Sequence, residues 1–87
     1  PDVAMSLNNL GTAYKALGET QRAIDYHEQS LAIYKQIHGD RPYPDVAGSL
    51  NNLGNAYYAL GETRRAIDYH EQSLAMKKLI HGDRPHP

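Results

Sequence analysis

Histidines have the clearest capacity for chemistry in this chain, because imidazole binds metal ions and exchanges protons near neutral pH. They stand at His27, His38, His70, His81 and His86. No two of them lie four residues apart, the spacing that places two metal ligands on one helix face, and the HExxH motif is absent. We therefore expect no metal site. His38, His81 and His86 fall in turns, where we expect exposed rings.

The other reactive residue types form no catalytic pattern. Carboxylates such as Asp25 and Glu28 fall on charged faces or at helix ends, not in the apolar setting that acid–base catalysis needs. The serines lack the GxSxG context of a hydrolase nucleophile, and the chain has no cysteine. The sequence thus predicts no catalytic residues, no cofactor and no enzymatic activity.

The length and composition of the chain limit the class of protein and the partners that it can have. The 87 residues amount to one small domain, and 40% of them are apolar, which is enough for a folded chain. Nine basic and ten acidic residues give a net charge of −1, so we expect neither nucleic acid nor a membrane as partner. The lack of cysteine is compatible with a reducing cytosol, and we expect a cytoplasmic protein. Because the chain begins at Pro1, we expect it to be a piece of a longer protein.

The chain consists of two copies of one unit. Residues 1–43 align with residues 44–86, and 35 of the 43 positions are identical. A fixed period of this size indicates stacked supersecondary units, none of which can bury its apolar face alone. The sequence therefore predicts a solenoid of two repeats.

Apolar residues at steps of three and four predict two helices in each repeat. The expected helices are residues 3–17 and 20–37 in the first repeat and residues 46–60 and 63–80 in the second. Asp2 and Asp45 can cap the first helix of each repeat, and a turn rich in glycine, aspartate and proline, residues 38–44, joins the repeats. No strand pattern occurs, so the fold class is all-α.

The second helix of each repeat is apolar on two sides. In the first repeat one stripe contains Ala23, Ile24, His27, Ser30 and Leu31. The other contains Tyr26, Ile33 and Ile37. A helix that is apolar on two sides is expected to lie between two neighbours, and we assign the second stripe to the contact with the next repeat.

Gly11 and Gly54 lie in the middle of a helix, where glycine is about 1 kcal/mol less favourable than alanine. We expect the paired helices to approach each other closely at these positions. Ala23 and Ser30 are the small residues on the partner helix of the first repeat. We expect His27 and His70 to be partly buried between the paired helices and neutral at pH 7.

These residues resemble the tetratricopeptide repeat. Its pattern is matched by Leu10-Gly11, Ala13-Tyr14, Gly18 and Ala23, and again by Leu53-Gly54, Ala56-Tyr57, Gly61 and Ala66. The long second helix and the HGDRPxPDVA linker look most like the long-repeat form of kinesin light chains and nephrocystin-like proteins. The resemblance implies a right-handed superhelix of helix-turn-helix repeats that binds protein. Two positions depart from the family pattern: His27 and His70 replace an aromatic residue, and Ser30 and Ser73 replace alanine.

The resemblance also implies that the first helix of each repeat lines a concave groove. The positions that face the groove are Met5, Asn8, Asn9, Thr12, Lys15, Ala16, Gly48, Asn51, Asn52, Asn55, Tyr58 and Ala59. From them we select as candidate peptide-binding residues Asn8, Asn9, Thr12, Lys15, Asn51, Asn52, Asn55 and Tyr58. Asparagine offers both a donor and an acceptor, which suits the main chain of an extended peptide. The alternative is that these asparagines form only a solvated face.

Differences between the repeats favour binding. All three differences between the two first helices fall on groove positions: Met5 against Gly48, Thr12 against Asn55, and Lys15 against Tyr58. Family members that bind acidic carboxy-termini use a lysine and arginine clamp, and only Lys15 could serve in one here. We therefore predict a scaffold that binds extended peptide segments, without that clamp. The alternative function is a structural spacer, or an engineered repeat array, that self-associates and has no specific ligand.

Two repeats without caps are also expected to associate head to tail, because roughly three repeats are usually needed for stability. We expect apolar residues at both ends of the chain to make this contact. These are Val3, Leu7, Leu10, Tyr69, Met76, Leu79 and Ile80.

Overall fold

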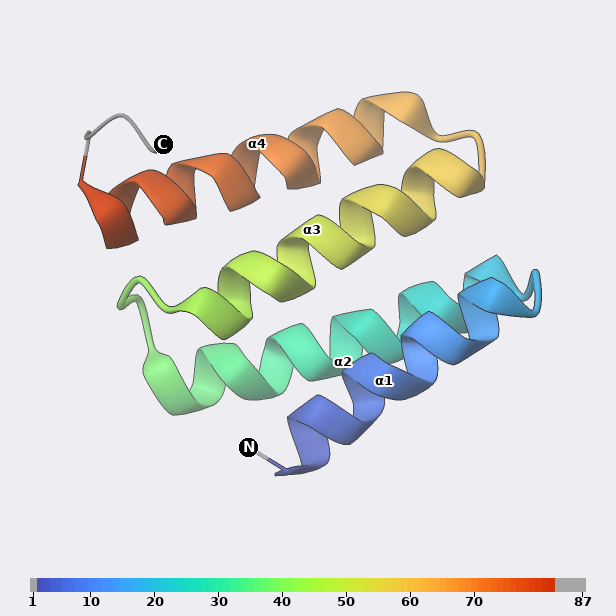
Figure 1. The fold of residues 1–87 in the computed structure, drawn as a ribbon, viewed down its shortest axis with the longest axis horizontal. Coiled ribbons are helices and arrows are strands. Elements are labelled where there is room, and N and C mark those ends of the chain that lie inside the picture. The colour runs from blue at the N-terminus through green and yellow to red at the C-terminus, as the bar shows by residue number, and fades with distance from the viewer. Residues whose placement is uncertain (1, 83–87) are drawn as a thin grey trace.

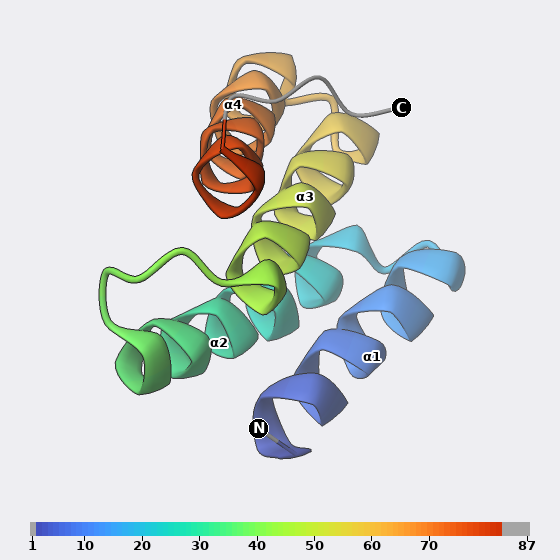
Figure 2. The same cartoon turned by 60° about the vertical axis from the view of Figure 1, so that its left-hand side comes forward.

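The computed structural model describes residues 2–82 and places four helices there. They are α1 (Asp2–Ala16), α2 (Thr20–His38), α3 (Pro44–Ala59) and α4 (Thr63–His81). Successive helices run antiparallel and stack in chain order from the N-terminus to the C-terminus (Figure 1). α1 and α3 lie on one side of the molecule, and α2 and α4 lie on the other (Figure 2). The all-α solenoid of helix pairs is confirmed.

The start of α3 differs from the expected one by two residues. Pro44 is the first helical residue, and Tyr43 in extended conformation precedes it without a side-chain cap. Asp45 therefore lies inside the first turn, where its charge complements the helix dipole, and the expected cap at this residue is wrong. The side chain of Asp2 lies outside the described residues. Gly18 and Gly61 follow the first helices at φ of 84° and 89°, a conformation that favours glycine.

Aromatic rings hold the turn between the repeats. The ring of His38 stacks on Tyr43 with centroids 3.4 Å apart and on Tyr34 at 6.2 Å. Tyr34 is buried, and His38 is half-buried instead of exposed as expected. His81 is exposed, and His86 lies outside the described residues. Because Tyr43 directly precedes α3, this stack helps to fix where the second helix pair begins.

α2 packs against both α1 and α3, so its expected place between two neighbours is correct. The stripe assigned to α3 is wrong at Tyr26 and Ile37, whereas Ile33 is partly buried and packs against the core. Tyr26 stacks on Tyr14 of its own pair, with ring centroids 5.4 Å apart, and Ile37 is exposed. Ile24 and Leu31 are the residues that the second pair covers, because their exposed fractions are 1% and 9%, whereas their equivalents in α4 are about half exposed. The helix phase is therefore rotated relative to the one inferred from the apolar pattern.

A histidine ring lies directly against a glycine in each helix pair. A Cβ atom added to Gly11 would lie 2.7 Å from His27 Nε2, and one added to Gly54 would lie 2.7 Å from His70 Nε2. Real Cβ atoms do not approach ring atoms this closely, so only glycine fits. The hydroxyls of Ser30 and Ser73 donate buried hydrogen bonds to the carbonyls of Ala4 and Ala47, at 2.8 and 2.9 Å. The serines that replace the family's alanine therefore tie the paired helices together.

The contact between histidine and glycine leads to a prediction with an internal control. Gly54→Ala should lower the free energy of unfolding by about 1–2 kcal/mol, because the overpacking outweighs the gain in helix propensity. Gly48→Ala in the same helix should raise it by up to about 1 kcal/mol, since nothing lies within 4 Å of its added Cβ. Urea unfolding followed by circular dichroism measures both. Equal effects of the two substitutions would contradict the packing argument.

Candidate functional site

The expected groove positions lie on α1 and α3, which form one side of the molecule (Figure 2). We call this side the α1–α3 face, and it bears the residues from Met5 to Ala16 and from Gly48 to Ala59 named above. Tyr58 and Met5 are its most exposed large apolar side chains, at 67% and 55%. Asn9, Thr12 and Asn55 are also exposed, whereas Asn8, Asn51 and Asn52 are half-buried.

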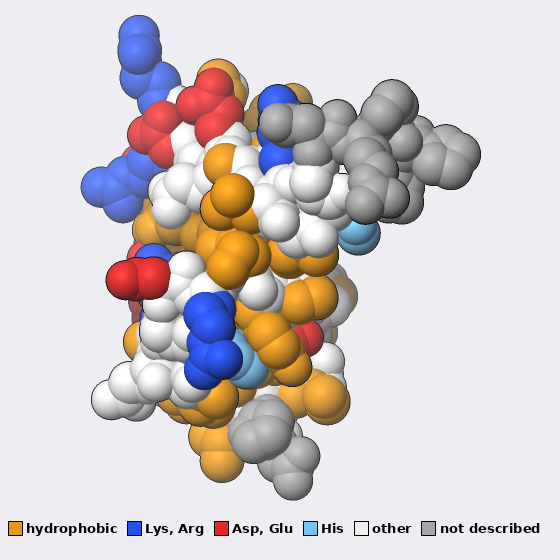
Figure 3. All heavy atoms as spheres, turned by 90° about the vertical axis from the view of Figure 1, so that its left-hand side faces the viewer, with side chains coloured by type: hydrophobic (Ala, Val, Ile, Leu, Met, Phe, Trp, Pro, Cys, Tyr) orange, Lys and Arg blue, Asp and Glu red, His pale blue; other side chains and the backbone are white. Residues whose placement is uncertain are grey.

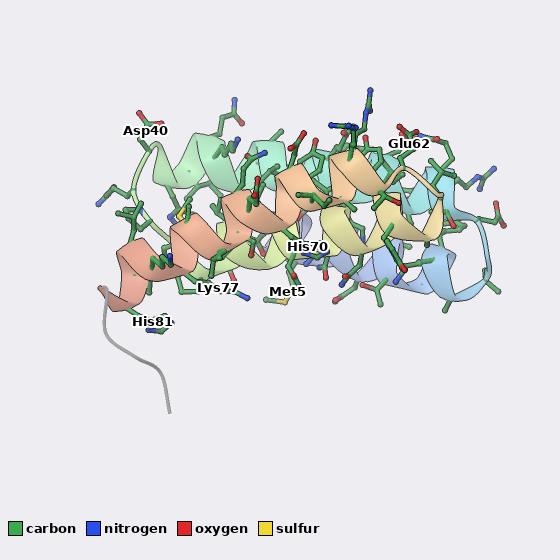
Figure 4. All side chains as sticks on the ribbon, turned by 90° about the horizontal axis from the view of Figure 1, so that it is seen from above. Met5, Asp40, Glu62, His70, Lys77 and His81 are labelled. Carbon is green, nitrogen blue, oxygen red and sulfur yellow. The ribbon has the colours of Figure 1, made fainter. Side chains whose placement is uncertain are left out.

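The α1–α3 face is almost free of charge. Apart from the aspartate in the first turn of each helix, α1 carries only Lys15 and α3 carries no other charged residue. Two acidic residues, Asp40 and Glu62, lie at the opposite edge of the molecule from Met5 (Figure 4). This face therefore presents amides, hydroxyls and one exposed aromatic ring.

Asn8 takes part in the fold in a way that the sequence did not indicate. Its Oδ1 atom lies 2.6 Å from Nδ1 of His27 and accepts a second hydrogen bond from Nδ2 of Asn52 at 3.2 Å. Because Oδ1 can only accept, Nδ1 of the ring carries the proton. One amide oxygen thus joins α1 to α2 and to α3.

The second repeat contains the first half of this arrangement. Nδ1 of His70 lies 3.0 Å from Oδ1 of Asn51. The partner that Asn52 provides for Asn8 would come from a following repeat. Asn8 and Asn51 therefore position histidine rings, and the amides of Asn9 and Asn55 remain exposed to solvent.

Burial lowers the pKa of His27. Its exposed fraction is 1%, and loss of hydration disfavours the charged ring, with the positive charge of Lys15 acting in the same direction. Since Nδ1 already holds a proton, a second proton would add to Nε2, the nitrogen turned toward Gly11. An imidazolium at this position would lie in the interface between the paired helices.

The lowered pKa of His27 gives a prediction for stability against pH. The unfolded chain takes up a proton at the ordinary histidine pKa near 6.5, whereas the folded chain does so only at lower pH. This group therefore leaves stability unchanged above pH 6.5 and destabilises the fold as the pH falls below it toward the lowered pKa. The melting temperature should drop between pH 7 and pH 5.

Two variants separate His27 from other titrating groups. His27→Phe keeps a ring over Gly11 and removes the titration, so the drop in melting temperature should shrink. His70→Phe makes the same change in the second repeat and should leave the contribution of His27 in place. A pH profile that is the same in the wild type and in His27→Phe would contradict the assignment.

A polar cluster at the junction of the two repeats was also missed by sequence reasoning. The Tyr57 hydroxyl donates to Oε2 of Glu28 at 3.2 Å and accepts from Nη1 of Arg65 at 3.4 Å. The same Tyr57 ring stacks on Tyr69 at 5.4 Å. Burial raises the pKa of Tyr57, the carboxylate of Glu28 adds to the increase, and Arg65 opposes it. The cluster requires residues from α2, α3 and α4, so the pattern of one repeat could not reveal it.

The residues expected at the two ends of the chain fall into two groups. Val3 and Leu10 on α1 are exposed, at 65% and 42%, and Leu7 is half-buried. At the other end, Tyr69 and Met76 pack against the core of the molecule, and Ile80 is half-buried. Leu79 is exposed and lines a shallow hollow with Ala75, Lys78 and Gly82.

α4 also exposes two apolar residues outside the expected set, Ile67 and Leu74, at 50% and 55%. The sequence could have indicated them through their equivalents Ile24 and Leu31, once the phase of α2 was known. Seen from the end of the molecule that contains the turn between α2 and α3, apolar side chains form a band along the middle of the surface (Figure 3).

Within residues 2–82, no three histidine or acidic side chains come together in a way that could hold a metal ion. In the same part of the chain, no helix combines the length and apolar character that crossing a bilayer requires.

The solved structure of BtubC (BKLC) from P. vanneervenii, a kinesin light chain-like tetratricopeptide-repeat protein, is 31% identical to this chain, with a TM-score of 0.83. The match covers 98% of this chain and 34% of that one, so the present sequence spans about a third of BtubC. No curated protein matches the chain.

The family profile gives the more direct evidence. The tetratricopeptide repeat family matches residues 2–78, which include all of α1, α2 and α3 and most of α4. The glycines, the paired helices and the turns described above lie within this match. The chain belongs to the tetratricopeptide repeat family and is a helical repeat scaffold of the kind that mediates protein–protein interactions.

Proposed function

We propose that the α1–α3 face binds an extended peptide segment of a partner protein. The observation that carries the proposal is a set of exposed side chains on two helices: Asn9 and Thr12 on α1, and Asn55 and the ring of Tyr58 on α3. The amide of Asn52 is held beside them by its hydrogen bond to Asn8. The function is binding without catalysis, and its proposed setting is the cytoplasm.

The chemistry of the face favours main-chain recognition. An extended peptide presents unpaired N–H and C=O groups along its length, and asparagine can donate to one and accept from the other. Tyr58 adds an amphipathic ring, the type of side chain that contributes most to binding energy at interfaces. With Lys15 as the single cation beyond the first turn of α1 and α3, the face has no strong preference for a charged peptide.

A second candidate function is self-association, in which the repeats act as a structural spacer. It is favoured by exposed apolar side chains at both ends, Val3 and Leu10 on α1 and Ile67 and Leu74 on α4. The two candidates use different surfaces, so one chain can have both.

Peptide selection followed by calorimetry tests the first candidate. A phage-displayed library of random 12-residue peptides is selected on the immobilised chain, and the selected peptides are synthesised and titrated. Asn9→Ala with Asn55→Ala should remove about 1 kcal/mol of binding free energy for each lost hydrogen bond, and Tyr58→Ala should remove about 2 kcal/mol. Gln29→Ala with Gln72→Ala changes two exposed residues on α2 and α4 and should leave the affinity unchanged.

Two results would contradict the peptide-binding proposal. If the selected peptides lose affinity in the Gln29 and Gln72 variant but not in the Asn9, Asn55 or Tyr58 variants, the binding surface is on the other side of the molecule. If selection yields no peptide that binds at submillimolar concentration, the spacer function is favoured instead.

A further inference from the structure

Each end of the molecule exposes one half of an interface that exists complete inside it. On α3, Val46 and Leu53 are buried against the first repeat, at 2% and 0% exposure. Their equivalents on α1, Val3 and Leu10, are 65% and 42% exposed. The same side chains are therefore buried on α3, where the first repeat covers them, and exposed on α1.

α4 exposes the other half. Ile24 and Leu31 on α2 are covered by the second repeat, whereas the identical residues on α4, Ile67 and Leu74, are 50% and 55% exposed. The exposed surface of α4 thus has the apolar residues that α2 uses to bind α3. The exposed surface of α1 has those that α3 uses to bind α2.

The residues of the polar cluster at the internal junction also have equivalents at the two ends of the molecule, with one part of the cluster at each end. Inside the chain, Glu28 of the first repeat accepts from the Tyr57 hydroxyl, to which Arg65 donates. On α4 the equivalent of Glu28 is Glu71, which is exposed. In the first repeat, Arg22 lies over the ring of Tyr14 at 5.4 Å, the same distance as Arg65 over Tyr57. The acid is present at one end of the molecule, and the tyrosine and arginine are present at the other.

We propose that a second copy of this chain binds head to tail, with its α1 against α4 of the first copy, and that Glu71 accepts a hydrogen bond from Tyr14 of the second copy. The inference rests on the proposed self-association and names the contacts that direct it. The apolar residues supply affinity, and the Glu71–Tyr14 bond sets the register, because a slipped α1 would leave the acid without its donor.

One difference makes the contact between copies weaker than the internal junction. Lys77 occupies the position of Tyr34, which is buried in the internal junction. Lys77 is exposed and points from α4 to the side on which α1 and α3 lie (Figure 4). Its ammonium can reach solvent while its methylene groups cover apolar surface, so the contact loses one aromatic ring without trapping a charge.

Two blocked variants reduce the assembly to a single contact. Leu10→Lys places a charge on the exposed surface of α1, and Leu74→Lys does so on α4. Each variant alone should sediment as a monomer, and an equimolar mixture should form a 1:1 complex through the one intact pair of surfaces. Val3→Lys and Ile67→Lys provide a second pair of blocks, also at exposed sites, and circular dichroism verifies that every variant is folded.

The hydrogen bond is then tested inside the 1:1 complex. Glu71→Gln in the copy blocked at α1, or Tyr14→Phe in the copy blocked at α4, should raise the dissociation constant about fivefold, and the pair together should raise it no further. Glu71→Gln in the copy blocked at α4 is the matched control and should have no effect, because that α4 lies outside the contact.

The possible results separate the two levels of the proposal. If folded variants form no 1:1 complex at millimolar concentration, head-to-tail association is wrong, and peptide titration of the same variants still reports on the α1–α3 face. If the complex forms but Glu71→Gln has equal effects in both copies, or the effects of Glu71→Gln and Tyr14→Phe simply add, the Glu71–Tyr14 contact is wrong.

Discussion

The spacing of each helix pair depends on a histidine ring that lies against a glycine of the neighbouring helix. The ring edge of His27 fills the volume where any side chain at Gly11 would lie, and the same contact recurs between His70 and Gly54. Such close packing brings the Ser30 hydroxyl within 2.8 Å of the Ala4 carbonyl. The conformational disadvantage of a mid-helix glycine is thereby offset by contacts that only glycine permits.

The same histidine links the fold to the candidate site. Its Nδ1 proton goes to Asn8, which also accepts from Asn52 of the next repeat, so one amide serves the core instead of a ligand. The two asparagines of each adjacent pair therefore have different roles. Asn8 and Asn51 position the histidine rings, whereas Asn9 and Asn52 belong to the α1–α3 face. A histidine in place of the family's usual aromatic residue has this consequence because only a ring with a polar edge can use the asparagine.

The periodicity of the sequence was sufficient to predict the helix pairs, because apolar residues recur at steps of three and four, the spacing of one helix face. The periodicity was not sufficient to predict which face of α2 packs against α3, because both stripes of α2 are apolar. Only the assembled structure shows that Ile24 faces α3 and that Tyr26 packs on its own helix pair. The hydrogen bond of Asn8 to a residue 19 positions away also depends on the crossing geometry of two helices. Local patterns therefore identify elements and faces, and contacts between elements require the assembled structure.

The near identity of the repeats means that a surface able to bind inside the chain also exists at its ends. What distinguishes the two junctions is the linker. Inside the chain, the stack of Tyr34, His38 and Tyr43 holds the turn, and the covalent connection makes docking of the second pair intramolecular. Between copies the same apolar residues must overcome the loss of translational and rotational freedom, and Lys77 takes the place of one ring. One interface chemistry can therefore give a permanent junction within the chain and a concentration-dependent contact between chains.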